Sequence, residues 1–144
     1  MTRLWLSSLC GCLVGLLCAR ASIRAEEYRL TTFSEDITIP IGHRCMGILP
    51  QKSVRVADPL EARGFVLRGA SLPIVVVALD WCEVRNGAYD RWRQVLADAA
   101  GTTRERVLVC SLHQHDAPVI DSDAASLLRE VGLENELYED PTTS

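Results

Sequence analysis

Residues 73–112 read PIVVVALDWCEVRNGAYDRWRQVLADAAGTTRERVLVCSL, with two apolar runs on either side of a more polar segment. The first run, residues 73–80, is continuous and rich in β-branched side chains, which is typical of a strand buried on both faces at the centre of a sheet. Pro73 fits only as its first residue, because proline has no N–H to donate to a neighbouring strand. The second run, residues 106–112, predicts a further apolar strand.

The segment between the two runs changes to a helical period after Asn86-Gly87. One stripe of the predicted helix carries Tyr89, Trp92, Val95, Leu96 and Ala99, and the opposite face carries Asp90, Arg91, Arg93 and Asp98. Gly101 predicts its C-terminal end. A strand, a helix and a strand form a βαβ unit, so we expect the two strands to be parallel and joined by a right-handed crossover.

Upstream of this unit, residues 61–68 predict another strand, which Gly69-Ala70-Ser71 turn back onto the central strand as a β-hairpin. A short alternating strand is expected at residues 36–40, after a polar lead-in at residues 22–36. Residues 42–58 have glycines and no sustained period, so they predict a loop. The fold class is therefore α/β, with a partial mixed sheet made of a β-hairpin and a βαβ unit.

Downstream, Asp121 or Ser122 is expected to cap a short helix that runs to Val131. Its inward-facing residues are predicted to be Leu127, Leu128 and Val131. Residues 132–144 are acidic and aperiodic, and they are interpreted as an irregular tail. The predicted domain thus covers residues 37–131.

The N-terminus has the pattern of a secretory signal peptide over residues 1–21. Arg3 precedes an apolar stretch, Leu4 to Cys18, and Ala19-Arg20-Ala21 offers a small-x-small cleavage site, with Ala25 as a second one. The alternative is a retained membrane anchor, but the apolar stretch is shorter than the roughly 20 residues that span a bilayer. We therefore expect export to the periplasm or the medium, with no transmembrane segment once the signal is removed.

The chain has 144 residues, enough for one domain, and a formal net charge of −4. Loss of Arg3 and Arg20 with the signal makes the charge more negative, which argues against nucleic acid as a partner. Three cysteines follow the signal: Cys45, Cys82 and Cys110. An odd number cannot pair completely, so buried free thiols are expected, with a Cys82–Cys110 disulfide as the alternative.

The second apolar run of the βαβ unit stops on two histidines, His113 and His115, one residue apart. Side chains at a strand end leave the core and converge on ligands, so two imidazoles there are placed for metal binding or proton transfer. Ligands of open α/β sheets bind beyond the carboxyl ends of the strands, and Asp80 is expected at that same edge. The alternative, that the histidines have no metal role, stays open.

Two carboxylates are candidates to support these histidines. Asp116 either orients His113 or His115 through a hydrogen bond or is a simple turn carboxylate. Asp80 is either a similar supporting group or a cap for the helix that starts near Asn86-Gly87.

Three further side chains are expected to have no role in binding or catalysis. His43, alone in the glycine-containing loop, is expected to be solvated. Trp81 and Trp92 are expected to pack in and around the core.

Several motifs in this order resemble the start of the neutral/alkaline non-lysosomal ceramidase family. They are Asp36-Ile37-Thr38, Met46-Gly47, Ala62-Arg63-Gly64-Phe65-Val66, the strand that ends at Asp80, and His113-Gln114-His115-Asp116-Ala117-Pro118. That family carries a DITGP-like opening, an ARAF[VI] strand, a strand that closes on a D-L-like pair, and an HTHSGP signature. Gln114, Asp116 and Ala117 depart from the signature, where the family has threonine, serine and glycine.

The resemblance implies a zinc amidase that cleaves the N-acyl bond of ceramide or a related lipid amide, a substrate compatible with presentation at a membrane surface. It implies that His113 is a zinc ligand and that His115 lies at the same catalytic centre. The family's other ligands, a second histidine, a glutamate and a tyrosine, come from later segments. The chain is thus expected to be the N-terminal fragment of a larger α/β hydrolytic domain, inactive alone; the alternative is an exported α/β binding or structural module without a metal.

Overall fold

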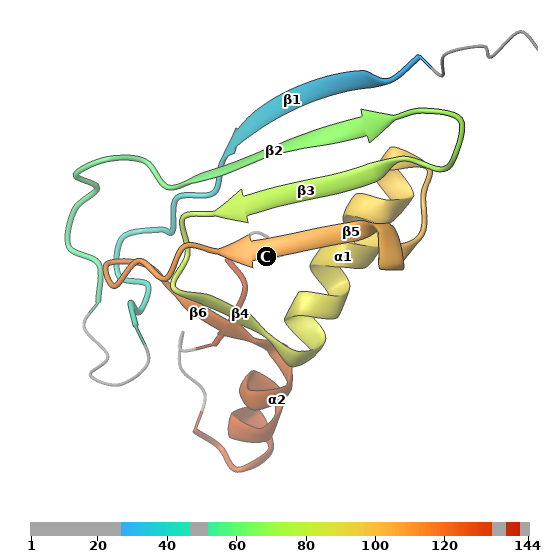
Figure 1. Ribbon diagram of the computed structural model, residues 1–144. Helices are drawn as coiled ribbons and strands as arrows, with labels where there is room; N and C mark the ends of the chain where they lie inside the picture. Colours follow the sequence, from blue (N-terminus) through green and yellow to red (C-terminus); the bar gives the residue numbers. More distant parts are fainter. Residues whose placement is uncertain (1–26, 47–51, 134–137, 142–144) are drawn as a thin grey trace, which may run out of the picture.

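The structure is a computed structural model, and it describes residues 27–46, 52–133 and 138–141. The predicted signal peptide lies outside these residues, as does part of the predicted tail. The elements, in chain order, are β1 (Arg29–Asp36), β2 (Glu61–Arg68), β3 (Ile74–Leu79), β4 (Glu83–Arg85), α1 (Asn86–Ala100), the 3-10 turn η1 (Arg104–Arg106), β5 (Val107–Ser111), β6 (Val119–Asp121) and α2 (Ser122–Glu130) (Figure 1).

The main sheet has the strand order β1-β2-β3-β5. β2 and β3 form an antiparallel hairpin, and β3 and β5 are parallel with Val77 opposite Val109. These pairings confirm the predicted hairpin and βαβ unit, with β3 in the interior of the sheet. The mixed α/β architecture is therefore the one that the sequence indicates.

A smaller parallel pair, β4 and β6, continues from the carboxyl edge of the main sheet. Glu83 pairs with Val119 and Arg85 with Asp121. Ile120 also bridges to Tyr138, and the backbone N–H of Asp121 donates to the carbonyl oxygen of Tyr138 over 2.9 Å. Part of the predicted tail thus packs back onto the domain.

The prediction of a strand at residues 36–40 is wrong. The first strand, β1, lies instead within residues 22–36, which were predicted to be a polar lead-in. β1 pairs with β2 along its whole length, from Arg29 opposite Arg68 to Asp36 opposite Glu61. The chain then leaves the sheet, because the Asp36 carboxylate accepts the backbone N–H of Thr38 over 2.8 Å in a local turn. β1 is an exposed edge strand, and its polar sequence gives no apolar alternation to detect.

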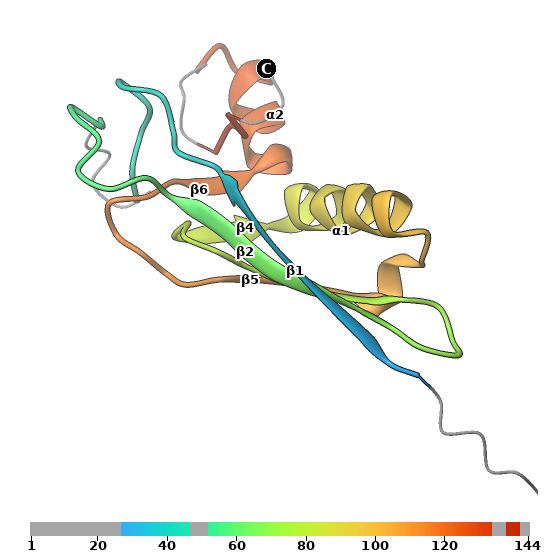
Figure 2. The same ribbon diagram turned by 90° about the horizontal axis from the view of Figure 1, so that it is seen from above.

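One face of the sheet is covered and the other is open. Val75, Val77 and Leu79 of β3 are buried on the face that α1 covers, whereas Ile74 on the opposite face is 39% exposed. Figure 2 shows α1 and α2 on the same side of the sheet. The prediction that β3 is buried on both faces is therefore wrong for one of them, since no described element covers that side.

Helix α1 has the predicted extent and ends at Gly101 in the left-handed conformation (φ 68°). Its contact stripe is rotated from the predicted one: Ala88 and Ala97 are buried, whereas Val95 is 59% exposed and Ala99 is also exposed. The two buried alanines let the helix approach the sheet closely, and larger side chains flank them. Tyr89, Trp92 and Leu96 pack against the core as expected.

Helix α2 begins at the predicted cap. The Asp121 carboxylate accepts the backbone N–H groups of Asp123 and Ala124. The predicted inward face is wrong, however, because Ala125 is the buried residue, whereas Leu127 and Val131 are 63% and 68% exposed and Leu128 is half-buried. Helix α2 contacts α1, and the last turn of α2 extends into solvent.

Trp81 joins the site edge to the core. Its side chain is fully buried, and its indole N–H donates to the carbonyl oxygen of Ile37 over 3.1 Å. The rings of Trp81 and Trp92 meet edge to face with their centres 5.4 Å apart. The predicted packing role of both tryptophans is confirmed.

Candidate metal-binding site at the carboxyl edge of the sheet

The loop that follows β5 is fastened to the end of β3 by backbone hydrogen bonds. The N–H of Leu112 donates to the carbonyl oxygen of Leu79 over 2.9 Å, and that of His113 donates to Trp81 over 3.2 Å. At the far end of the loop, the N–H of Cys82 donates to Pro118 over 3.0 Å. Both ends of the loop are therefore fixed to one short segment, and the histidines between them lie at the predicted edge.

His113 has a backbone φ of 59°, a left-handed conformation that is uncommon outside glycine. Such a conformation persists where surrounding contacts hold it, and it occurs often at functional sites. Here it breaks the course of β5 directly after Leu112. It thereby sets the direction in which the His113 side chain leaves the sheet.

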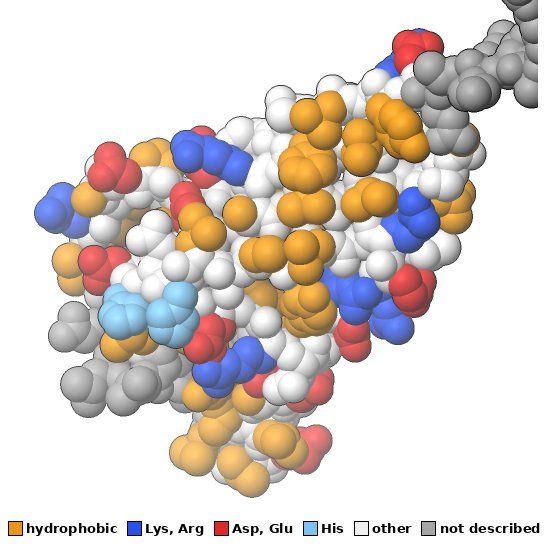
Figure 3. Space-filling view, viewed as in Figure 1, with side chains coloured by type: hydrophobic (Ala, Val, Ile, Leu, Met, Phe, Trp, Pro, Cys, Tyr) orange, Lys and Arg blue, Asp and Glu red, His pale blue; other side chains and the backbone are white. Residues whose placement is uncertain are grey.

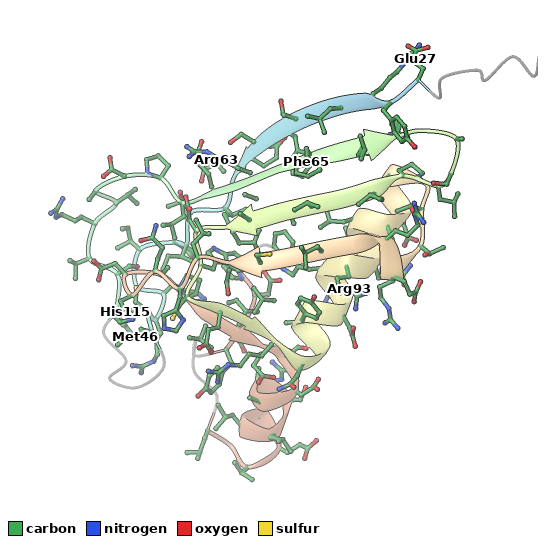
Figure 4. All side chains as sticks on the ribbon, in the orientation of Figure 1. Glu27, Met46, Arg63, Phe65, Arg93 and His115 are labelled. Atoms are coloured by element: carbon green, nitrogen blue, oxygen red, sulfur yellow. The ribbon has the colours of Figure 1, made fainter. Side chains whose placement is uncertain are left out.

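The two imidazoles lie together, with ring centres 5.3 Å apart and planes at 73°. Figure 3 shows two adjacent histidine side chains in pale blue at the surface, and Figure 4 places His115 beside Met46. Two imidazoles bound to one tetrahedral zinc ion at about 2.0–2.1 Å have ring centres about 5 Å apart. The separation of His113 and His115 is therefore compatible with a shared ion.

Both histidines line a pocket of about 340 Å³. Its lining consists of Met46, Cys82, Glu83, Arg85, His113, His115, Val119 and Tyr138. The pocket lies where the main sheet and the small β4–β6 sheet meet, beyond the carboxyl ends of β3 and β5. This is the position at which ligands bind in open α/β sheets.

Glu83, the first residue of β4, is the acidic side chain of this pocket that sequence reasoning missed. Its Oε1 lies 3.6 Å from Nδ1 of His113, and its other carboxylate oxygen pairs with the guanidinium of Arg85. The signal was present in the sequence, because Glu83 follows the predicted central strand by only a few residues. A chain that turns at the sheet edge keeps such residues near that edge.

Asp80 and Asp116 are placed differently. The Asp80 carboxylate accepts the backbone N–H of Glu61 over 2.9 Å, which joins β3 to the start of β2. It does not cap α1, because the position before that helix is Arg85 and carries no side-chain cap hydrogen bond. Asp116 is exposed, and its charge helps to raise the pKa of Cys45. Supporting roles for either carboxylate stay predictions.

His43 is buried, with 6% of its surface exposed, so the expectation that it is solvated is wrong. Its Nδ1 lies 2.9 Å from the carbonyl oxygen of Arg44 and, when protonated, donates to it. The loop folds inward at this residue because the backbone N–H and carbonyl groups of His43 bond to Pro40 and Ser53.

The three cysteines of the described residues are free thiols. Cys82 is buried and Cys110 is exposed, so the expectation of buried thiols holds for Cys82 and fails for Cys110. Burial raises the pKa of Cys82, with a further contribution from the Glu83 carboxylate. Burial is also the main cause of the raised pKa of Cys45.

The described residues offer two imidazoles but not a complete metal site. Within residues 27–46, 52–133 and 138–141, no three His, Cys, Asp or Glu side chains converge on one point. A hydrolytic zinc ion needs about three protein ligands and an open position. The pair alone falls short of such a set, so a zinc ion at this place would need further ligands from outside the described residues.

No protein-family model matches the sequence, and no curated protein matches it. Among solved structures, the fold is similar to that of neutral ceramidase from Pseudomonas aeruginosa, with a TM-score of 0.51 and 24% sequence identity. The similarity covers 65% of this chain and 16% of the ceramidase chain. A ceramidase-like fold is thus supported for this chain. Among the described helices, none is long and apolar enough to cross a membrane.

Proposed function

We propose that this chain is the N-terminal part of an exported, zinc-dependent amide hydrolase of the neutral ceramidase type. Its substrate is the N-acyl bond of ceramide or of a related lipid amide, and the chain has no hydrolase activity alone. The observation that carries the proposal is the pair His113 and His115 at the carboxyl edge of β3 and β5. The fold that holds them is similar to part of a neutral ceramidase.

In this proposal, His113 is the zinc ligand and His115 acts at the same centre. Zinc, when bound, supplies a Lewis acid that polarises the amide carbonyl and activates water. The chain itself fixes the direction of the His113 side chain through the left-handed backbone and the hydrogen bond to Trp81. His115 lies close enough to serve as a second ligand or to move a proton at the reacting amide.

The open face of the sheet supports the proposal that a larger domain completes this unit. Its register places Leu30, Phe65, Val76 and Leu108 on one face, and Figure 3 shows hydrophobic side chains gathered over these strands. Leu30 and Leu108 are 62% and 49% exposed. Sheets with parallel strands are normally covered on both faces, so further layers of protein are expected here.

A second candidate function is an exported α/β binding or structural module with no metal. The observation that favours it is the lack of a third converging ligand among the described residues. The two candidates differ in one measurable property, since only the hydrolase segment binds zinc at the histidine pair.

The test is zinc binding by the full chain, measured by calorimetry and by elemental analysis after dialysis. We expect weak binding of one zinc ion, which is lost in His113→Ala and strongly reduced in His115→Ala. Asp58→Asn is the control, because it removes an exposed carboxylate charge that does not line the pocket. Binding that is absent in the unsubstituted chain, or unchanged in the histidine variants, refutes the zinc proposal.

A second assay tests the proposal that the chain has no hydrolase activity alone. The full chain is incubated with zinc and a fluorescent ceramide in mixed micelles, and release of the fatty acid is measured. We expect no release above the zinc-only background. Turnover by this chain alone contradicts the proposal that further segments supply the missing ligands.

A further inference from the structure

Glu83 is held in a fixed place beside the histidine pair. It is the first residue of β4, and that strand pairs in parallel with β6, which places Glu83 opposite Val119. The backbone N–H groups of both Cys82 and Glu83 donate to the carbonyl oxygen of Pro118. The backbone that carries Glu83 is therefore tied to the far end of the histidine loop.

The two carboxylate oxygens of Glu83 face different partners. One oxygen pairs with the guanidinium of Arg85, two residues along the same strand. The other, Oε1, lies 3.6 Å from Nδ1 of His113. Because Oε2 is buried beside Arg85, Oε1 is the carboxylate oxygen that faces the imidazole.

The contact between Glu83 and His113, 3.6 Å, is longer than a hydrogen bond but within the usual range of an ion pair, N···O up to about 4 Å. Hydrogen bonds of functional groups often tighten only when a ligand binds. The Glu83 side chain is 26% exposed and that of His113 is 60% exposed, so His113 has room to rotate by the small angle that closes the distance.

Other groups near His113 are weaker candidates for a hydrogen bond with its Nδ1 atom. The sulfur of Cys82 lies 4.0 Å from Nδ1, but a thiol is a weak hydrogen-bond partner compared with a carboxylate. The charge of Asp116 acts on Cys45, whose pKa it helps to raise, and among the described residues the carboxylate that pairs with His113 is that of Glu83. Nδ1 of His113 is thus flanked by one strong acceptor, Glu83.

A carboxylate that accepts the Nδ1 proton of an imidazole leaves the Nε2 lone pair free to bind a metal or to take a proton. Free imidazole places the proton on Nε2 in preference, so a nearby carboxylate reverses that preference. We propose that Glu83 is the positioning residue of the site, which holds the proton of neutral His113 on Nδ1 and directs Nε2 to the pocket. The functional meaning of this inference rests on the proposed zinc site, but its test does not.

The experiment is NMR on the uniformly ¹⁵N-labelled full chain without metal, at a pH where the imidazoles are neutral. The ¹⁵N shifts of the two ring nitrogens show which one carries the proton, and His113→Ala assigns the signals. We expect the Nδ1–H form to predominate at His113 in the unsubstituted chain. We expect the Nε2–H form to predominate in Glu83→Ala.

Glu83→Gln is the conservative variant, because its side-chain carbonyl still accepts the Nδ1 proton, and it should restore the Nδ1–H form at least in part. Asp58→Ala is the control, because it removes an exposed carboxylate that does not line the pocket, and it should leave His113 unchanged. Near-UV circular dichroism of the aromatic side chains, which include the buried Trp81, verifies the fold of each variant. A predominant Nε2–H form in the unsubstituted chain overturns the inference without any variant, and so does an unchanged tautomer in a folded Glu83→Ala.

Zinc titration separates this inference from the proposed function. If zinc binds to the unsubstituted chain, Glu83→Ala should weaken the binding by about 10–100-fold, the usual effect of losing such a partner. A predominant Nδ1–H form in a chain that binds no zinc supports the role of Glu83 and refutes the zinc site. Zinc binding by a chain whose metal-free His113 carries its proton on Nε2 supports the zinc site and refutes the role of Glu83.

Discussion

The indole N–H of Trp81 donates a hydrogen bond to the backbone carbonyl oxygen of Ile37, 3.1 Å away, inside the core. Through this bond, the segment that follows β3 is fixed to the segment that follows β1. The carbonyl oxygen of the same tryptophan accepts the N–H of His113. Trp81 therefore connects the folding of the N-terminal strand to the placement of the histidine pair.

Trp81→Phe should destabilise the protein by about 2–3 kcal/mol. The substitution leaves the Ile37 carbonyl buried without its donor, which costs about 1–3 kcal/mol, and it reduces packed volume in the core. Trp92→Phe is the comparison, because Trp92 is only half-buried and its partner, the Asp140 carboxylate, is part-buried too. Urea unfolding measures both; an equal loss in the two variants contradicts the assigned role of Trp81.

Gly64→Ala should disrupt the β1–β2–β3 region more than Gly101→Ala disrupts α1. A Cβ on Gly64 would lie 2.4 Å from the carbonyl oxygen of Val76 and 2.5 Å from the Phe33 ring. Gly101 has open space around it, so alanine there costs only the left-handed backbone, about 1–2 kcal/mol. Thermal unfolding followed by circular dichroism should show the larger loss for Gly64→Ala.

Cys110 should react with iodoacetamide much faster than Cys82. Cys110 is exposed on the open sheet face, whereas Cys82 is buried and its pKa is raised, so little of it is the reactive thiolate near neutral pH. Mass spectrometry of the digested protein at successive times gives both rates. Denaturation should make the rates similar, and equal rates in the native protein would refute the buried position of Cys82.

The raised pKa of Cys82 also gives a pH dependence of stability. A thiol whose pKa is higher in the folded than in the unfolded chain favours folding only while it is neutral. Its contribution is complete below the ordinary value of 9.0 and is lost as the pH rises through the higher folded value. Cys82→Ala should therefore flatten the alkaline fall of the urea midpoint, and an equally steep fall in this variant contradicts the prediction.

Leu108→Lys should keep the fold and reduce self-association. Leu108 is 49% exposed on the open face of β5, and exposed apolar patches promote association. Val109→Lys is the matched variant, because the next residue along the strand points to α1 and is 6% exposed. Analytical ultracentrifugation and circular dichroism should show a folded, less associated Leu108→Lys and an unfolded Val109→Lys.

The sequence was sufficient for the hairpin, the βαβ unit and the Asp121 cap, because each depends on residues close together in the chain. It was not sufficient for β1, whose polar residues lie on an exposed edge and are held by backbone pairing with β2. The open sheet face was missed for a related reason. An apolar run such as Ile74–Leu79 shows that a strand is suited to burial, but not which partner is there to bury it.

At the candidate site, the sequence predicted where the two histidines would meet the sheet edge, because strand ends follow from strand periodicity. It could not predict that Glu83 would be their neighbour. That contact depends on the pairing of β4 with β6, two short strands from distant parts of the chain. The burial of His43 likewise depends on backbone bonds to Pro40 and Ser53 that no local pattern encodes.

The small β4–β6 sheet has a dynamic consequence for the pocket beneath the histidines. Each strand has only three residues, and the pairing joins segments on either side of the whole βαβ unit. Short ladders open at low free energy where few buried contacts hold them, but β6 is buried along its whole length and Ile120 belongs to the core. The ladder should thus open only together with the core, so the amide hydrogen of Ile120 should exchange with solvent about as slowly as those of Val77 and Val109, and the pocket should persist for as long as the molecule stays folded.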